Sequence, residues 1–326
     1  MKKISKTILT GAGAAAAGAA AVGAMVYAST NFLVKVAMDR QTPKVGNMEK
    51  QRDQLRGFLN CDAFIDEMMA EAEKLETAPH DIVQIQSYDG QTLVGHWFGC
   101  DDPKRIILAM HGWRSCWSTD FGTVADFWRE QDCSVLYAEQ RGQGNSGGEY
   151  IGFGLTERYD CLEWIKWLNT HWGKGLPIYL AGVSMGATTV LMASGLELPE
   201  NVRGIMADCG FTSAHDIWKH VAENNLHLKY DLHGSVADNL FRDRIQMGTK
   251  DYSTVDALKN CKVPVLLIHG TDDHFVPVHM TYENYQACAS QKYLLIVPGA
   301  DHGMSHYMEK ERYEQMMLAF WKETEG

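Results

Sequence analysis

The sequence predicts an α/β fold with a mostly parallel sheet and helices on both faces, on the basis of three observations. Short unbroken apolar runs recur along the chain, and such runs are typical of strands that are buried on both faces of a sheet. Segments with helical spacing lie between these runs, and this alternation is characteristic of parallel sheets. One run is followed directly by a G-x-S-x-G turn at residues 182–186 and then by a helical segment.

Length and composition limit the possible functions. The 326 residues suffice for one α/β domain with an extension, and 45% apolar with 22% charged residues is ordinary for a globular protein. A formal net charge of −11 argues against a nucleic-acid partner. The eight cysteines form no C-x-x-C pair, so a zinc site is not indicated, and we expect most of them to be small buried hydrophobic residues.

Residues 1–34 are predicted to be a membrane anchor or a signal segment. Thr7 to Val34 carries no charge and is long enough to span a bilayer as a helix. As a signal peptide, the segment would offer small residues at Val26 to Ala28 for cleavage. We expect a membrane-anchored protein whose main domain lies outside the cytoplasm, with a secreted or cytoplasmic protein as the alternatives.

Residues 35–79 are predicted to hold a linker and a packing helix. The polar stretch 35–57 has the composition of a linker, and residues 58–75 have the apolar spacing of a helix that ends before Pro79. A chain that begins near Gln41 is therefore expected to be soluble and to keep the activity of the main domain.

The main domain is expected at residues 80–326. It begins with a hairpin over 82–98 that turns at Asp89-Gly90. Buried strands are then expected at 106–110, 135–138, 178–181, 205–207, 265–268 and 293–297. Helices are expected at about 120–131, 156–171, 185–197, 278–289 and 305–323.

One interval, residues 212–260, is much longer than a crossover between neighbouring strands requires. It is predicted to be an inserted helical lid over the carboxyl edge of the sheet, where open α/β sheets bind ligands. Aromatic residues indicate an apolar pocket there, or packing beneath the lid: Trp113, Trp117, Phe211, Trp218 and Phe275.

The G-x-S-x-G turn predicts a nucleophile at Ser184. Between a strand and a helix, this motif is the nucleophile elbow of α/β hydrolases. Glycines permit the sharp, strained turn, and the N-terminus of the following helix favours a developing negative charge. The alternative is an ordinary glycine-rich turn.

A serine alcohol needs a base, and the chain order of this fold is nucleophile, acid, histidine. His302 follows the last predicted strand, so it is the predicted base. The acid is expected after the strand at 265–268, where Asp272 and Asp273 are adjacent. One of them would orient His302 and the other would turn the chain, with Asp208 as a further candidate for the acid.

Two backbone N–H groups are needed to bind an oxyanion. Met185, directly after the nucleophile, is predicted to supply one. The second is expected from the loop after the strand at 106–110, and we assign it to Trp113. His111 in the same loop is predicted to brace it.

Several stretches carry a family resemblance. They are Tyr88 to Gly90, His111 to Trp113, Arg141 to Gly148, Gly182 to Gly186, Gly270 to Pro277 and Gly299 to Gly303. Over residues 81–324 the chain resembles bacterial α/β hydrolases of the serine aminopeptidase-like and lysophospholipase-like group, including anchored cell-surface hydrolases. In that family the acid precedes x-x-Val-Pro, which matches Asp273. The family's R-G-x-G-x-S stretch usually follows an Asp, whereas Glu139 stands in that region here.

The resemblance implies a serine hydrolase that cleaves a small-molecule ester, in the manner of a carboxylesterase or lipase, through an acyl-enzyme on Ser184. A serine peptidase acting on short peptides and an acyltransferase are the alternatives. The intact order of nucleophile, acid and histidine argues against a binding protein without activity. No metal or organic cofactor is expected, and the membrane is the expected partner of the N-terminal segment.

Overall fold

The computed structural model describes residues 2–42, 62–172 and 175–325. Within these ranges, an eight-stranded sheet has the order β1-β2-β4-β3-β5-β6-β7-β8. Its strands are β1 (Asp81–Gln86), β2 (Thr92–Phe98), β3 (Arg105–Met110), β4 (Cys133–Ala138), β5 (Ile178–Val183), β6 (Val202–Asp208), β7 (Val265–Gly270) and β8 (Lys292–Val297). β2 pairs antiparallel with β1 and β4, and all other pairs are parallel. The predicted α/β class is confirmed.

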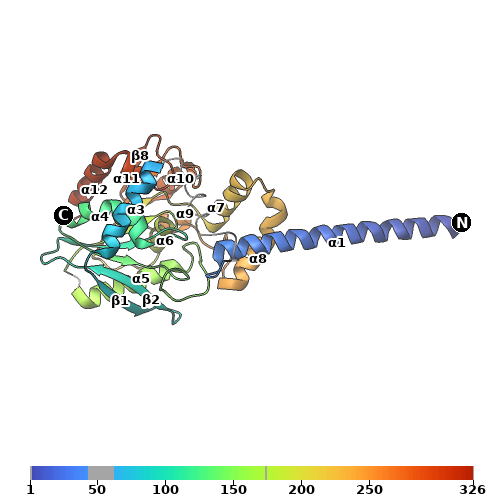
Figure 1. Cartoon of the computed structure of the whole chain (residues 1–326), viewed down its shortest axis with the longest axis horizontal. Coiled ribbons are helices and arrows are strands. Elements are labelled where there is room, and N and C mark those ends of the chain that lie inside the picture. The colour runs from blue at the N-terminus through green and yellow to red at the C-terminus, as the bar shows by residue number, and fades with distance from the viewer. Residues whose placement is uncertain (1, 43–61, 173–174, 326) are drawn as a thin grey trace.

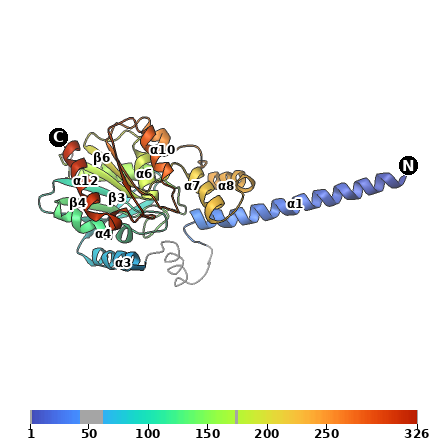
Figure 2. The ribbon, with the colours of Figure 1, turned by 90° about the horizontal axis from the view of Figure 1, so that it is seen from above.

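Helices cover both faces of this sheet (Figures 1 and 2). One face is covered by α3 (Asp62–Thr77), α4 (Trp117–Glu130) and α12 (Lys310–Thr324), and the other by α5 (Glu157–Trp172), α6 (Met185–Ala193), α9 (Thr254–Leu258) and α10 (His279–Ala287). The last predicted helix is divided in two. α11 (Ser305–Met308) ends at Glu309, whose φ of −135° and ψ of 56° are not helical, and α12 follows.

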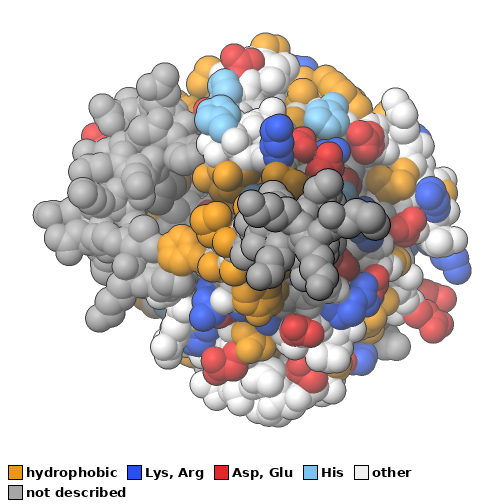
Figure 3. Space-filling view, turned by 90° about the vertical axis from the view of Figure 1, so that its right-hand side faces the viewer, with side chains coloured by type: hydrophobic (Ala, Val, Ile, Leu, Met, Phe, Trp, Pro, Cys, Tyr) orange, Lys and Arg blue, Asp and Glu red, His pale blue; other side chains and the backbone are white. Residues whose placement is uncertain are grey.

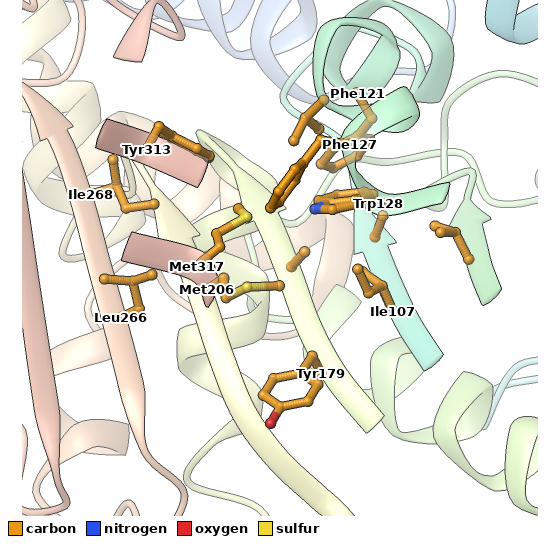
Figure 4. Close-up of a cluster of buried hydrophobic side chains, with 14 of the residues drawn as sticks. Ile107, Phe121, Phe127, Trp128, Tyr179, Met206, Leu266, Ile268, Tyr313 and Met317 are labelled. Atoms are coloured by element: carbon orange, nitrogen blue, oxygen red, sulfur yellow. The ribbon is translucent and has the colours of Figure 1, made fainter. Parts of the chain in front are cut away.

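Large apolar side chains fill the space between the sheet and the helices α4 and α12 (Figure 4). The buried residues include Phe121, Phe127, Trp128 and Met317 from the helices and Ile107, Tyr179, Met206 and Leu266 from the strands. Burying a side chain of this kind contributes roughly 1.5–3 kcal/mol. This layer therefore stabilises β3, β5, β6 and β7, whose carboxyl ends lead into the loops described below.

A further group of helices lies over the carboxyl edge of the sheet. We call it the cap, and it consists of α7 (Ala214–His220), the π-helical turn η1 (Val221–Asn225) and α8 (Tyr230–Ile245). The predicted lid at 212–260 extends too far, because it includes α9. Leu258 of α9 is fully buried in the apolar layer between the sheet and α6, so α9 belongs to the covering of the sheet.

The N-terminal helix α1 (Lys2–Met38) projects from the domain beside α8 (Figures 1 and 2). The helix continues past residue 34, the predicted end of the N-terminal segment, to Met38. Val34 and Met38 are four positions apart on one face of α1, and both are buried in the apolar cluster beneath the cap. Residues 43–61, which include most of the predicted linker and the start of the predicted helix, lie outside the described residues.

The stretch Ala20–Met38 of α1 is long and apolar enough to cross a membrane, with a mean hydropathy of 1.3. Only 17% of it is buried inside the protein. Hydrophobic side chains also gather around the base of α1 on the face seen along the helix (Figure 3). Phe32 of α1 is exposed, as are Leu226 and Leu232 of the cap. A signal segment and a membrane anchor are both consistent with this composition.

The seven described cysteines are free thiols. Five of them are buried, as expected for small hydrophobic residues: Cys133, Cys161, Cys209, Cys261 and Cys288. Cys61 lies outside the described residues.

A buried ion pair holds the glycine-rich turn after β4. Arg141 is only 6% exposed, and its Nε lies 2.6 Å from Oδ2 of Asp160, which is 2% exposed. Its Nη1 donates to Asp89 of the β1–β2 turn at 2.8 Å. Gly144 has a φ of +52°, and a side chain there would collide with Glu139. The stretch from Arg141 to Gly148 thus joins the hairpin, the sheet and α5.

Replacing Arg141 with Met should lower the free energy of unfolding by about 3–5 kcal/mol, because it leaves the Asp160 carboxylate buried without its partner. Urea unfolding followed by circular dichroism measures this change. Arg242→Met is the matched control, because Arg242 pairs with Asp251 on the surface. If both variants lowered the free energy of unfolding by the same small amount, this result would contradict a stabilising role for the buried ion pair.

Candidate active site

A strained turn between β5 and α6 presents Ser184 at the carboxyl edge of the sheet. Ser184 has a φ of 55° and a ψ of −118°, a conformation that residues with a side chain rarely adopt. A Cβ on Gly182 would collide with the backbone of Gly186, and one on Gly186 would collide with the carbonyl of Met110 in β3. The two glycines therefore allow α6 to start directly against the sheet, with Ser184 at its N-terminus.

The structure brings Ser184 together with His302 and Asp273. The Ser184 Oγ lies 2.9 Å from His302 Nε2, and His302 Nδ1 lies 2.7 Å from the Asp273 carboxylate. These residues follow β5, β8 and β7 respectively. They meet because parallel strands end at the same edge of a sheet.

The other two aspartates do not contact His302 in this way. Asp272 is exposed, and its carboxylate accepts a hydrogen bond from Thr271 Oγ1 at 2.6 Å. Asp208 is buried and accepts from Ser305 Oγ at 3.0 Å, while its backbone carbonyl accepts from the Ser184 N–H at 2.9 Å. Of the three candidates, Asp273 is the one whose carboxylate reaches His302.

A second histidine, to which the sequence analysis gave no role, holds Asp273. His269 Nε2 lies 3.0 Å from Asp273 Oδ2 and 2.8 Å from the Val276 carbonyl, and its Nδ1 lies 2.6 Å from Thr281 Oγ1. The N–H groups of Phe275 and Val276 donate to the other carboxylate oxygen, at 2.9 and 2.7 Å. The sequence did contain a signal for this role, because His269 is a polar residue at the end of a buried strand, four positions before Asp273.

These contacts set the protonation states of Asp273 and His302. Burial opposes ionisation of Asp273, but the charge of His302 and the hydrogen bonds from His269 and His302 outweigh it, so the pKa of Asp273 lies below its usual range. Burial likewise disfavours the imidazolium of His302, yet the Asp273 carboxylate raises the pKa of His302 well above its ordinary value. Burial raises the pKa of the neighbouring Cys209 thiol to about 11, so this thiol is neutral near pH 7.

Cys209, Asp273 and His302 also form a possible metal-ligand group. One ligand atom from each lies within 4.8 Å of the others. However, Asp273 and His302 already hydrogen-bond each other, and Asp273 accepts further bonds from His269 and two backbone N–H groups. The arrangement is therefore that of a hydrogen-bonded acid and base.

The loop after β3 lies directly against Ser184. A Cβ on Gly112 would lie 3.3 Å from the Cβ of Ser184, so a larger residue would crowd the serine. His111 is buried, with Nδ1 2.8 Å from the Gly112 carbonyl and Nε2 accepting from the Gln140 N–H at 3.0 Å. The predicted bracing role of His111 is confirmed.

In the same loop, the N–H groups on either side of Trp113 already have acceptors. The Gly112 N–H donates to Asp120 Oδ2 at 2.5 Å, and the Arg114 N–H donates to Gln143 Oε1 at 2.6 Å. Between them, the Trp113 N–H has no acceptor among the described residues, and neither does the Met185 N–H. Both are therefore free to donate to a bound oxyanion.

Apolar side chains surround this edge of the sheet. Met185 and Phe211 are buried in the cluster beneath the cap, and Trp218 packs against that cluster. The Phe275 ring lies 5.2 Å from the His302 ring and 6.5 Å from the Trp113 ring. Trp117, by contrast, does not belong to the site. It is 5% exposed and stacks on His96 at 4.2 Å, on the face covered by α4.

Comparison with known proteins finds relatives that match part of this chain. YqkD, an uncharacterized protein of Bacillus subtilis, is 26% identical over 191 residues, which are 57% of this chain and 61% of YqkD. Lysophosphatidylserine lipase ABHD12 of Xenopus tropicalis is 25% identical over 162 residues, or 49% of this chain and 40% of that protein. The chain thus matches less than two thirds of the length of either relative.

The esterase Pf2001 of Pyrococcus furiosus has a similar fold, with a TM-score of 0.64 and 21% identity. The alignment covers 78% of this chain and 94% of the esterase, which confirms the α/β-hydrolase fold. The sequence model of the prolyl oligopeptidase family matches residues 118–326, a range that includes Ser184, Asp273 and His302. This match covers more than half of the chain, and the chain therefore belongs to the prolyl oligopeptidase family of serine hydrolases.

Proposed function

We propose that the protein hydrolyses carboxylic esters through an acyl-enzyme on Ser184. The hydrogen-bonded series from Ser184 Oγ through His302 to Asp273, with distances of 2.9 and 2.7 Å, is the observation that carries this proposal. Ser184 is the proposed nucleophile, His302 the general base and Asp273 the group that orients the base.

In the proposed reaction, Ser184 Oγ attacks the ester carbonyl carbon while His302 Nε2 takes the serine proton. The N–H groups of Trp113 and Met185 donate to the oxyanion. The bond from the carbonyl carbon to the alcohol oxygen then breaks, and His302 returns the proton to that oxygen. A water molecule attacks the acyl-enzyme with the help of His302, which releases the acid and restores Ser184. Asp273 keeps the remaining proton on Nδ1 and stabilises the imidazolium.

The surroundings of Ser184 support an acyl substrate. Aromatic and aliphatic side chains line this edge of the sheet, among them Met185, Phe211 and Phe275. Pf2001 is named an esterase and ABHD12 a lipase. The cap, as the proposed lid, would set the preference for acyl-chain length. The family also includes peptidases by its name, so hydrolysis of short peptides is the second candidate.

The membrane is the proposed partner of α1. The apolar stretch Ala20–Met38 and the hydrophobic side chains around its base support an anchor that holds the active site near a lipid surface (Figure 3). A chain cleaved after Ala28 would keep residues 29–38 of the helix, so either fate of the N-terminus preserves the last turns of α1.

The protein should hydrolyse unactivated esters, such as monobutyrin, and fail to cleave alanine p-nitroanilide. Ester turnover measured by pH-stat and nitroaniline release measured by absorbance decide between the two candidates. Ser184→Ala should abolish turnover and also labelling by a fluorophosphonate probe, located by mass spectrometry. Faster cleavage of the anilide would favour the peptidase, and labelling at another serine would overturn the assignment of the nucleophile.

Asp273→Asn should lower kcat by about 10⁴ with little change in KM, because His302 then adopts the wrong tautomer. Asp272→Asn is the matched control, since its carboxylate faces Thr271 and solvent. It should keep most of the activity. Steady-state ester hydrolysis measures both variants, and the reverse ranking would show that the acid is the other residue.

The pH profile of kcat/KM should reflect the raised pKa of His302. The imidazole must be neutral to accept the serine proton, so activity is lost as the pH falls through this pKa. Because Asp273 raises that value, the acid limb should lie above the ordinary histidine value of about 6.5. Histidine NMR titration of Ser184→Ala should give the same pKa. A limb at or below about 6.5 would contradict the protonation states described here.

A further inference from the structure

The last turn of α1 is hydrogen-bonded to the loop that carries the proposed oxyanion donor. Trp113 Nε1 donates to the Ala37 carbonyl at 2.7 Å. The Arg114 guanidinium donates through Nε to the Val36 carbonyl at 2.9 Å and through Nη2 to the Asp39 carbonyl at 2.7 Å. The last carbonyls of a helix lack partners within the helix, and here the side chains of this loop satisfy them.

The two side chains that bind α1 belong to the residue with the proposed oxyanion N–H and to the residue directly after it. Trp113 supplies the proposed oxyanion N–H, and Arg114 follows it. Arg114 has a φ of +51°, which is unfavourable for a residue with a side chain and persists only where the surroundings hold it. The Gln143 side chain holds the Arg114 N–H, and α1 holds its guanidinium.

The interface between α1 and the domain is closely packed. Val34 and Met38 are 2% and 0% exposed, and they belong to the apolar cluster that contains Met185, the other proposed oxyanion donor. Asp39 Oδ1 accepts from Arg244 Nε of α8 at 2.7 Å, with both side chains mostly buried. The end of α1 therefore contacts the cap and the loop of Trp113 and Arg114, and it shares an apolar cluster with Met185.

The chemistry of Arg114 suits this position. Burial lowers the pKa of Arg114 and the Asp39 carboxylate opposes that effect, while a guanidinium stays charged in either case. The negative end of the α1 dipole favours a cation at this point. A planar guanidinium reaches two carbonyls at once, whereas a lysine ammonium is a single point of charge.

We propose that α1 is part of the active-site framework, with Trp113 and Arg114 as positioning residues through which its last turn sets the place of the Trp113 N–H. This inference rests on the proposed ester hydrolysis. It reverses the expectation that a chain beginning near Gln41 keeps its activity, because such a chain lacks Val36, Ala37, Met38 and Asp39. Membrane attachment and catalysis would then depend on the same helix.

The test uses the full-length protein in detergent and compares Arg114→Gln and Trp113→Phe with a matched control, Arg40→Gln. Arg40 also joins the end of α1 to the domain, but through the carbonyls of Gly144, Ser146 and Gly148 rather than the oxyanion loop. Arg114→Gln should lower kcat by about 10²-fold with KM nearly unchanged, comparable to the loss of one oxyanion donor.

Trp113→Phe replaces the indole with a smaller aromatic ring and removes its N–H donor, so a loss of about twofold to tenfold in kcat is expected. The rate of fluorophosphonate labelling at Ser184 should fall in parallel, while the acid limb of the pH profile stays in place because His302 and Asp273 are untouched. Arg114→Lys should recover part of the lost rate. Arg40→Gln should keep the wild-type kcat.

Wild-type kcat in both loop variants, or an equal loss in Arg40→Gln, would overturn the inference and leave the proposed function standing. A wild-type protein that is not labelled at Ser184 and does not cleave esters would instead overturn the proposed function. Should Arg114→Gln fail to fold, as judged by its unfolding midpoint, the milder Trp113→Phe variant still decides the question.

Discussion

The close approach of the β5–α6 turn to β3 is the constraint on which the site depends. Gly186 lies so near the Met110 carbonyl that no side chain fits between them, and a Cβ on Gly112 would lie 3.3 Å from the Cβ of Ser184. The strained backbone of Ser184 is stable because the buried layer of aromatic and aliphatic side chains fixes the strands on either side. Loosening this contact would move Ser184 relative to His302 and to the loop after β3.

Asp273 and His302 reach this serine from two other strands. Asp273 receives hydrogen bonds from two histidines and two backbone N–H groups, so its carboxylate has little freedom to turn away from His302. His269 thus contributes to the site through the Asp273 carboxylate oxygen that it shares with His302. Such support explains how a charged carboxylate can be stable in a buried position.

The N-terminal helix connects this edge of the sheet to a long apolar segment. Its exposed stretch is apolar, while its last turn is buried among the cap, the oxyanion loop and the stretch from Gly144 to Tyr150. A helix that served only as a tether would need only the exposed apolar stretch. The closely packed last turn indicates that the helix is also an element of the folded domain.

Much of the fold followed from the sequence alone, because periodicity and turn chemistry are local. The hairpin, the six apolar strands and the elbow at Ser184 were all predicted, as was the grouping of Ser184, His302 and an acid after β7. Local patterns could not choose between Asp272 and Asp273 without the family resemblance, since adjacent side chains differ only in the direction that the folded loop gives them.

The tertiary structure decided what depends on residues distant in the chain. It showed that His269 hydrogen-bonds to Asp273 and that α9 covers the sheet. It also showed that α1 continues to Met38 and that Trp113 and Arg114 donate hydrogen bonds to its last turn. The charge-free run that suggested a membrane anchor carries no sign of these contacts. They join residues about 75 positions apart, and their partners are backbone carbonyls, which every residue possesses and no sequence pattern distinguishes.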